Sequence, residues 1–165
     1  MKRQARIESF AVKQISVLLA DDHAAFRKSL KLLIETDGDI QVVGEAKNGC
    51  EAVSLARSLN PDVIVMDIAM PLLNGLQATQ KIMATSPGSR VLILSAHPDP
   101  EYIELALSFG VSGYLFKQSS TQFLAQAIRE VKMGNAYFSA SIPKRLRDEC
   151  KASFVKAHAL KKNAA

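Results

Sequence analysis

The sequence of 165 residues contains no tryptophan, only two cysteines, and no apolar run long enough to cross a membrane. Cys50 and Cys150 lack CxxC or Cys/His spacing, which argues against a zinc motif and favours reduced, structural thiols. Neither a GxGxxG loop nor a Walker-type phosphate loop occurs, so nucleotide binding has no local signature. Residues 7–14 are too polar for the hydrophobic segment of a signal peptide, and we therefore expect a cytoplasmic protein without membrane contact.

Charge is distributed unevenly along the chain. Residues 144–165 carry seven Lys or Arg and two Asp or Glu, whereas positive and negative charges balance in residues 1–143, so this last segment accounts for the net charge of +5. The length supports one domain with appendages. We expect a basic arm over residues 1–14, a folded domain over 15–135, and a basic amphipathic helix or linker over 136–165.

Hydrophobic patterning predicts five repeats of a strand followed by a helix. The predicted strands are 15–20, 40–46, 63–66, 90–94 and 114–116, and the predicted helices are 24–35, 49–59, 75–85, 99–109 and 121–133. Strict alternation with short connections indicates a parallel sheet covered by helices on both faces. Five strands are too few for a (β/α)₈ barrel. The predicted fold is therefore an α/β, doubly wound, five-stranded parallel sheet.

Chemically versatile residues follow four of the predicted strands. Asp21 and Asp22 follow the first strand, Asp67 the third, Ser95 the fourth and Lys117 the fifth. Each type is common at strand ends as a helix cap or a solvated charge, but in a doubly wound sheet they converge on one edge. Carboxylates, a hydroxyl and an ammonium group together suit metal-assisted phosphoryl transfer.

Roles in such a transfer can be assigned from the residue types. Asp67, central in the sheet, is the candidate nucleophile. We expect Mg²⁺, or Mn²⁺ in its place, to be bound by Asp22 and Asp67, with Asp21 acting through water. Lys117 and Ser95 are expected to contact phosphoryl oxygens.

Residues 15–133 resemble the receiver domain of bacterial two-component response regulators. The resemblance is carried by LLADDH at 18–23, MDIAMPLLNG at 66–75, the Ser95-Ala96 pair and GYLFK at 113–117. It implies a flavodoxin-like fold with strand order 2-1-3-4-5. It also implies that a sensor histidine kinase, or a phosphotransfer protein, donates a phosphoryl group to Asp67.

The resemblance extends to further positions. It implies that the backbone carbonyl of Ala69 is a metal ligand beside Asp21, Asp22 and Asp67, and that Tyr114 moves inward when Ser95 senses the phosphoryl group. Gln118 stands where most of the family has proline, often with a cis bond that costs roughly 3–4 kcal/mol without proline. The side chains of Ala69 and His97 occupy positions that influence the lifetime of the acyl phosphate. Ala69 cannot orient a water molecule, and an effect of His97 is a hypothesis.

A further helix is expected from a cap at Ser141 to about residue 161. Its apolar stripe consists of Ile142, Leu146, Cys150, Phe154 and Ala157. The segment AYFSASIPKRL at 136–146 resembles the junction that follows the receiver in regulators with a LuxR-type helix-turn-helix domain, and that DNA-binding domain is absent from the sequence. Three interpretations of this helix are open. It is a linker, or its apolar stripe packs on the receiver or on a second copy in a homodimer, or its basic face attracts DNA weakly.

The expected function is that of a signalling domain that is not an enzyme. Mg²⁺-dependent phosphorylation of Asp67 would switch its conformation and control an output such as transcription. One alternative is a pseudo-receiver that binds partners without phosphorylation. An aspartyl-phosphate phosphatase is disfavoured because Ala69 stands where its second acid belongs, and a flavodoxin because residues 21–23 replace its Ser/Thr/Gly-rich phosphate loop.

Overall fold

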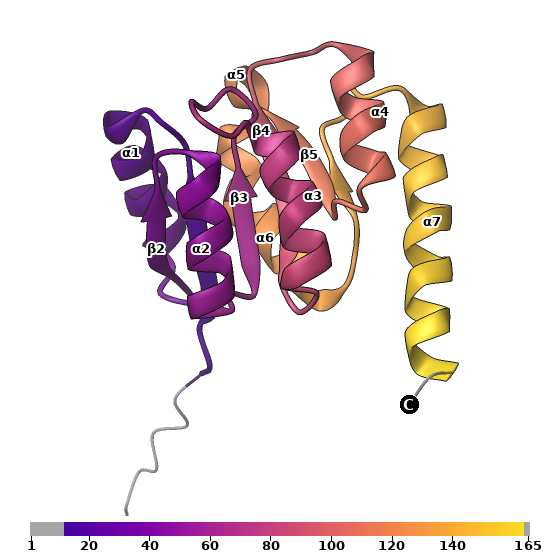
Figure 1. Cartoon of the computed structure of the whole chain (residues 1–165), viewed down its shortest axis with the longest axis horizontal. Coiled ribbons are helices and arrows are strands. Elements are labelled where there is room, and N and C mark those ends of the chain that lie inside the picture. Colours follow the sequence, from indigo (N-terminus) through magenta and orange to yellow (C-terminus); the bar gives the residue numbers. More distant parts are fainter. Residues whose placement is uncertain (1–11, 164–165) are drawn as a thin grey trace, which may run out of the picture.

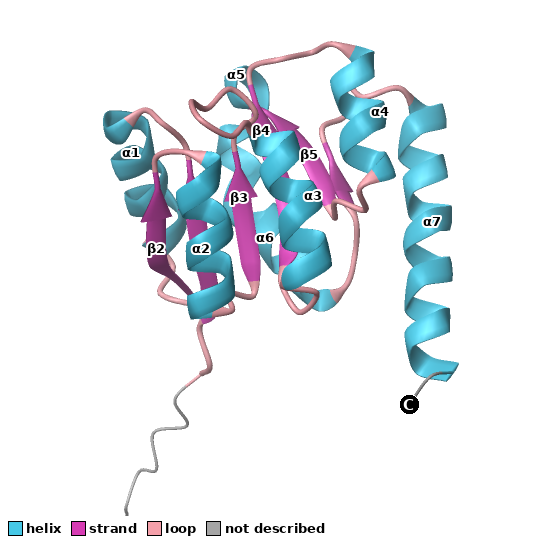
Figure 2. Cartoon of the chain, in the orientation of Figure 1, coloured by secondary structure: helices cyan, strands magenta, loops and turns pink. Residues whose placement is uncertain are grey.

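Six parallel strands form one sheet in the computed structural model, in the order β2-β1-β3-β4-β5-β6 (Figures 1 and 2). The structure describes residues 12–163, apart from the side chains of residues 120, 153–155, 157, 158 and 160–163. The strands are β1 (Ile15–Ala20), β2 (Ile40–Ala46), β3 (Val63–Met66), β4 (Arg90–Ser95), β5 (Gly113–Phe116) and β6 (Tyr137–Phe138). The predicted α/β fold and the order of the first five strands are confirmed.

Helices cover both faces of the sheet. The apolar cluster on one face contains residues of α2 (Gly49–Leu59), α3 (Gly75–Thr85), α4 (Pro100–Ser108) and α7 (Lys144–Asn163), and the cluster on the other contains residues of α1 (Ala24–Glu35) and α6 (Leu124–Met133). Successive strand residues alternate between the two clusters: Ile64 and Met66 belong to the first, Val63 and Val65 to the second. All four are buried, which explains the uninterrupted apolar runs in the sequence.

The sixth strand was not predicted. β6 pairs with β5 through Tyr137, whose N–H donates to the Ser112 carbonyl at 3.0 Å, and through Ser139, whose N–H donates to the Tyr114 carbonyl at 3.0 Å. Close approach requires a glycine in β5, because a Cβ on Gly113 would lie 2.2 Å from the Tyr137 carbonyl oxygen. Two residues are too few to give a periodic signal, so this strand is visible only from its pairing.

Helical structure after β5 begins earlier than predicted. A short helix α5 (Lys117–Ser120) and a 3₁₀ turn η1 (Thr121–Phe123) precede α6, whereas the sequence predicted a single helix from residue 121. No cis peptide bond occurs within residues 12–163, and Gln118 lies inside α5. Lys117 therefore directly follows β5 and is the first residue of a helix.

The last helix begins at Lys144, so the prediction of a cap at Ser141 was wrong. Proline disfavours helical geometry at the residue before it, and Ile142, which precedes Pro143, instead donates its N–H to the Ser139 carbonyl at 3.0 Å. Ile142, Leu146 and Cys150 are buried, so this part of the predicted stripe packs on the receiver. The side chains of Phe154 and Ala157 lie outside the described part, as do residues 1–11 of the predicted basic arm.

Both cysteines are free, as expected, with Cys50 exposed and Cys150 buried. Within residues 12–163, no helix combines the length and the apolar character needed to span a membrane.

Candidate functional site

Two carboxylates are buried where β1 and β3 end. Asp21 and Asp67 expose only 3% and 4% of their surface. The strand ladder continues into both residues: the Asp67 N–H donates to the Ala20 carbonyl at 2.8 Å, and the Asp21 N–H donates to the Ala46 carbonyl at 3.0 Å. The backbone of neighbouring strands thus fixes the two side chains at one edge of the sheet.

Lys117, at the end of β5, joins the two carboxylates. Its Nζ lies 2.6 Å from Asp21 Oδ2 and 3.1 Å from Asp67 Oδ2. The ammonium also lies 4.8 Å from the centre of the Phe26 ring on α1, which gives it a cation–π contact. Three of the residues predicted from strand ends are therefore in direct contact.

The charges of this group do not balance, since two buried carboxylates face one ammonium. Burial raises the pKa of the Asp67 carboxyl, the Lys117 charge lowers it, Asp21 raises it again, and the result lies above the usual value. Burial lowers the pKa of Lys117, but the hydrogen bond with Asp21 and the charge of Asp67 outweigh burial and raise it. Lys117 is thus charged at neutral pH, and an added cation would relieve the remaining negative charge.

Asp22 and His23 extend the acid cluster toward solvent. The Asp22 side chain is 33% exposed, and His23 Nδ1 lies 3.0 Å from Asp22 Oδ1 and 3.4 Å from Asp21 Oδ1. Among the described residues, Asp21, Asp22 and His23 form the group whose potential ligand atoms all lie within 4.8 Å of one another. Asp67 does not belong to this group. Sequence reasoning missed His23, although its place directly after the acid pair was a signal.

The donor types fit Mg²⁺ better than a softer metal. Carboxylate oxygens are its preferred ligands, and the exposed Asp22 leaves room for the water molecules that Mg²⁺ retains. Asp21 is already engaged, since its Oδ1 accepts the His23 N–H at 2.8 Å and its Oδ2 contacts Lys117. The role of Asp21 in binding the ion through water stays a prediction.

The loop after β3 approaches Asp67 closely. The Gly75 N–H donates to the Ile68 carbonyl at 2.9 Å, and a Cβ on Gly75 would lie only 1.8 Å from the Asp67 carbonyl oxygen. Ala69, the predicted carbonyl ligand, lies exposed in this loop. Only glycine at position 75 therefore allows α3 to begin directly against the residue that carries the central carboxylate.

Ser95 and Tyr114 form a second buried group beside the carboxylates. Ser95 Oγ accepts the N–H of His97 at 3.1 Å, and the Tyr114 hydroxyl donates to the His97 carbonyl at 2.9 Å. Tyr114 is fully buried, and burial raises its pKa to about 12. Tyr114 thus lies inward in this structure, and its movement in response to a phosphoryl group stays a prediction.

His97 is half-buried, and its ring centre lies 5.4 Å from that of Tyr102. Its contacts with Ser95 and Tyr114 come from the backbone, which residue identity alone could not reveal.

Comparison with known proteins gives concordant matches. The family model described as the response regulator receiver domain matches residues 17–129. The transcriptional regulatory protein DegU of Brevibacillus brevis is 37% identical over 136 residues, covering 82% of this chain and 58% of that protein. The response regulator protein VraR of Staphylococcus aureus is 34% identical over 137 residues, covering 83% of this chain and 66% of VraR.

Solved structures agree with these matches. The signal receiver domain of the response regulator NarL from Mycobacterium tuberculosis superposes with a TM-score of 0.71 at 32% identity, covering 74% of this chain and 99% of that domain. A LuxR-family two-component response regulator from Aurantimonas gives a TM-score of 0.77 at 33% identity, with coverage of 83% and 98%. The chain spans less than two thirds of the length of the curated relatives DegU and VraR.

Proposed function

Because this chain belongs to the response regulator receiver domain family, we propose that it accepts a phosphoryl group on Asp67 from a sensor histidine kinase or a phosphotransfer protein. The contact of Lys117 with both buried carboxylates, at 2.6 and 3.1 Å, is the observation that carries the proposal. It supplies a nucleophile and a positive charge at one point, which phosphoryl transfer to a carboxylate requires.

In the proposed transfer, a carboxylate oxygen of Asp67 forms a bond to phosphorus while the bond from phosphorus to the donor's histidine nitrogen breaks. Lys117, which contacts Asp67, would pair with a phosphoryl oxygen, and Ser95, at the end of the neighbouring strand, would donate a hydrogen bond to another. Mg²⁺, or Mn²⁺ in its place, would be held by Asp21, Asp22, Asp67 and the carbonyl of Ala69. When bound, the ion neutralises the acid cluster and the phosphoryl oxygens.

The output of this reaction is a change in conformation. Ser95, Lys117 and Tyr114 are proposed to sense the phosphoryl group, because Ser95 and Tyr114 are both hydrogen-bonded to the backbone of His97, in the segment before α4. The side chains of Ala69 and His97 would set the lifetime of the acyl phosphate. The name of DegU indicates a transcriptional regulator, and we extend control of transcription to this protein as part of the proposal.

The domain boundaries belong to the same proposal: an arm over 1–14, a receiver over 15–135, and a linker over 136–165 toward an output domain that contacts DNA. The proposed setting is the cytoplasm, where a kinase partner and a second copy of the chain are both accessible. The protein would act as a signalling domain and not as an enzyme on a separate substrate.

Intact-mass measurement tests the proposal. The full chain is incubated with Mg²⁺ and acetyl phosphate, beside the variants Asp67→Asn and Asp148→Asn, the second of which removes an exposed carboxylate on α7. We expect one phosphoryl group on the parent and on Asp148→Asn, and none on Asp67→Asn. A folded parent that gains no mass would support the alternative of a pseudo-receiver that binds partners without phosphorylation.

A further inference from the structure

Two consecutive residues of α1, Phe26 and Arg27, contact the two partners of the buried ion pair at the candidate site. The Phe26 ring lies against the Lys117 ammonium, with 4.8 Å between Nζ and the centre of the ring. Arg27 Nη1 donates to the backbone carbonyl of Asp21 at 2.6 Å. Both contacts are possible because α1 begins at Ala24, directly after the turn that follows β1. The first turn of α1 thus supports the ammonium and the carboxylate at the same time.

The ring of Phe26 holds the ammonium in place without adding a charge to the site. A ring face attracts a cation within about 6 Å, and the attraction is stronger where water is excluded. The Lys117 side chain is only 17% exposed. Phe26 is itself fixed, since it packs against the apolar cluster that α1 and α6 form on the sheet. The ring therefore restrains a long, flexible lysine side chain beside the two carboxylates.

This restraint does not depend on Asp67. Lys117 Nζ lies 2.6 Å from Asp21 Oδ2 and 3.1 Å from Asp67 Oδ2. A phosphoryl group bonded to Asp67 would alter the second contact, whereas Asp21 and Phe26 would still hold the ammonium. Lys117 is then already in place when a phosphoryl oxygen needs a positive charge, and fixing a reacting group in advance lowers the entropy lost in the reaction.

Arg27 supports the other partner of the ion pair through its backbone. The guanidinium donates to the Asp21 carbonyl and, from Nε, to Glu45 Oε1 on β2 at 3.3 Å. The Arg27 side chain is only 15% exposed, and hydrogen bonds from a charged donor are stronger than neutral ones. The Asp21 carbonyl belongs to the planar peptide unit that joins Asp21 to Asp22. Arg27 therefore fixes the orientation of the peptide between the two acids that follow β1.

We propose that Phe26 and Arg27 are positioning residues for phosphoryl transfer to Asp67, an inference that rests on the proposed function. Phe26 orients the ammonium that pairs with the phosphoryl group. Arg27 orients the acid pair that would hold the divalent ion. The two roles predict different defects, because weakening the ring face slows the transfer, whereas removing the guanidinium weakens binding of the ion.

Fluorination of the Phe26 ring tests its role while the packing stays nearly constant. Phenylalanine with one, two or three ring fluorine atoms is incorporated at position 26, which weakens the negative ring face stepwise. Intact mass gives the rate of phosphorylation by acetyl phosphate at saturating Mg²⁺. We expect the rate to fall with each fluorine, by about 2- to 30-fold in total. The same series at Phe109, which packs on the other face of the sheet, should leave the rate unchanged.

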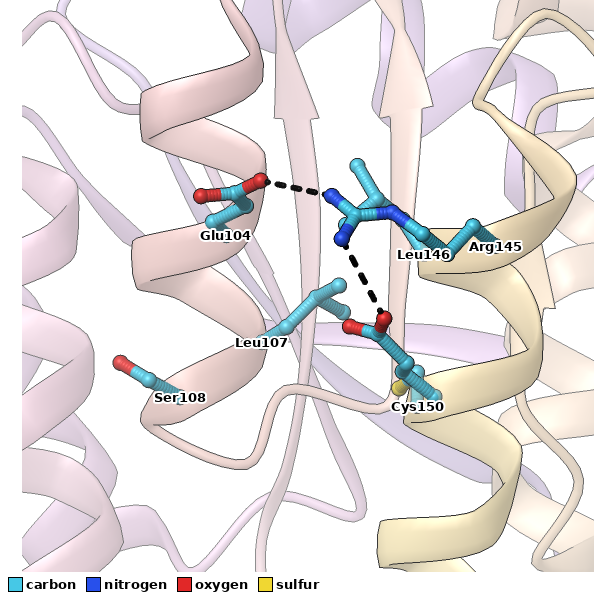
Figure 3. A pocket seen from close by; sticks show the side chains of 7 residues that line it. Glu104, Leu107, Ser108, Arg145, Leu146 and Cys150 are labelled. Carbon is cyan, nitrogen blue, oxygen red and sulfur yellow. Dashed lines mark hydrogen bonds and ion pairs between the residues drawn. The ribbon is translucent and has the colours of Figure 1, made fainter.

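Arg27→Lys tests the second role. Lysine keeps the charge but lacks the fork that reaches the Asp21 carbonyl and Glu45 together. We expect the dissociation constant for Mn²⁺, measured from the electron paramagnetic resonance signal of the free ion, to rise about tenfold. Arg145→Lys is the matched control and should bind Mn²⁺ as the parent does. Arg145 Nη2 also lies 3.3 Å from a glutamate oxygen, that of Glu104, but across the groove between α7 and α4 (Figure 3).

Labelling of Lys117 separates this inference from the proposed function. A pulse of acetic anhydride, followed by peptide mass spectrometry, reports how firmly each lysine is held and requires no phosphorylation. We expect the trifluorinated Phe26 chain to raise the Lys117 acetylation rate severalfold and to leave exposed Lys28, on the same helix, unchanged.

The two proposals fail in different ways. A chain that gains no phosphoryl group contradicts the proposed function, and the Lys117 and Mn²⁺ measurements then decide the positioning roles. A chain that is phosphorylated at one rate across the Phe26 series, with unchanged Lys117 labelling, overturns the role of Phe26 and leaves the proposed function intact. Unchanged Mn²⁺ binding in Arg27→Lys overturns the role of Arg27.

Discussion

Lys117 and Asp21 are 96 residues apart in sequence, yet the Lys117 ammonium lies 2.6 Å from the Asp21 carboxylate. The contact joins the first strand of the domain to the last of its five predicted strands, and it occurs in a setting where neither charge is well solvated. Removal of the Lys117 ammonium would leave Asp21 and Asp67 buried with no cation between them. Breaking a buried ion pair in this way lowers the stability of the folded state.

We therefore expect Lys117→Met to lower the free energy of unfolding at neutral pH by roughly 1–3 kcal/mol in the absence of divalent ions. Mg²⁺ should stabilise this variant more than it stabilises the parent, because the acid cluster then lacks its internal cation. Thermal unfolding over a Mg²⁺ titration measures both effects. Equal Mg²⁺ stabilisation of the two proteins would contradict the view that Lys117 and the ion neutralise the same carboxylates.

Gly75→Ala should be strongly destabilising, by about 3 kcal/mol or more, because its Cβ would fall 1.8 Å from the Asp67 carbonyl oxygen. Gly88→Ala is the matched control, since a Cβ there meets nothing within 4 Å, and we expect a change within about 0.5 kcal/mol. Urea unfolding compares the two variants. Similar stabilities would mean that the loop after β3 tolerates displacement.

Asp62 directly precedes β3 and so lies at the end of the sheet away from the candidate site. It should contribute stability that depends on pH. Burial raises its pKa, but hydrogen bonds from Lys132 and Ser16 outweigh burial and hold the pKa below the usual value of 3.8. The contribution of the charged form is fully present above that value and is lost as the pH falls through the lower folded value.

Asp62→Asn is accordingly expected to cost roughly 1–3 kcal/mol at pH 7, and the difference from the parent should shrink as the pH falls below about 4. Urea unfolding as a function of pH checks the result, with Asp148→Asn on α7 as the control. A difference that stays constant down to pH 2.5 would show that packing, and not charge, determines the effect.

Much of the fold could be predicted because local signals agreed with one another. The runs at 15–20 and 63–66 are uninterrupted because both faces of the sheet are covered, and the strand bounds match the observed ones. The candidate site followed from the same logic, since residues after parallel strands must share an edge. The convergence of Asp21, Asp67 and Lys117 needed only that topology.

What the sequence could not reveal depends on long-range contacts. β6 exists because Gly113 lets Tyr137 approach, and the start of α7 depends on Pro143 and on a hydrogen bond between Ile142 and Ser139. His97 acts through its backbone, which no residue type predicts. Periodicity could identify the stripe on α7 but not the surface of the receiver that it would cover.

The short sixth strand also limits how these molecules can associate. Within the described sheet, β2 and β6 are the two edges, and an exposed edge is a template on which another chain can add a strand. β6 offers only two residues for such pairing, and β2 exposes Gln41, Val43 and the charged Glu45 along its length. The short β6 and the charge on β2 thus work against the addition of further strands at the two edge strands, although the sheet does not close into a barrel.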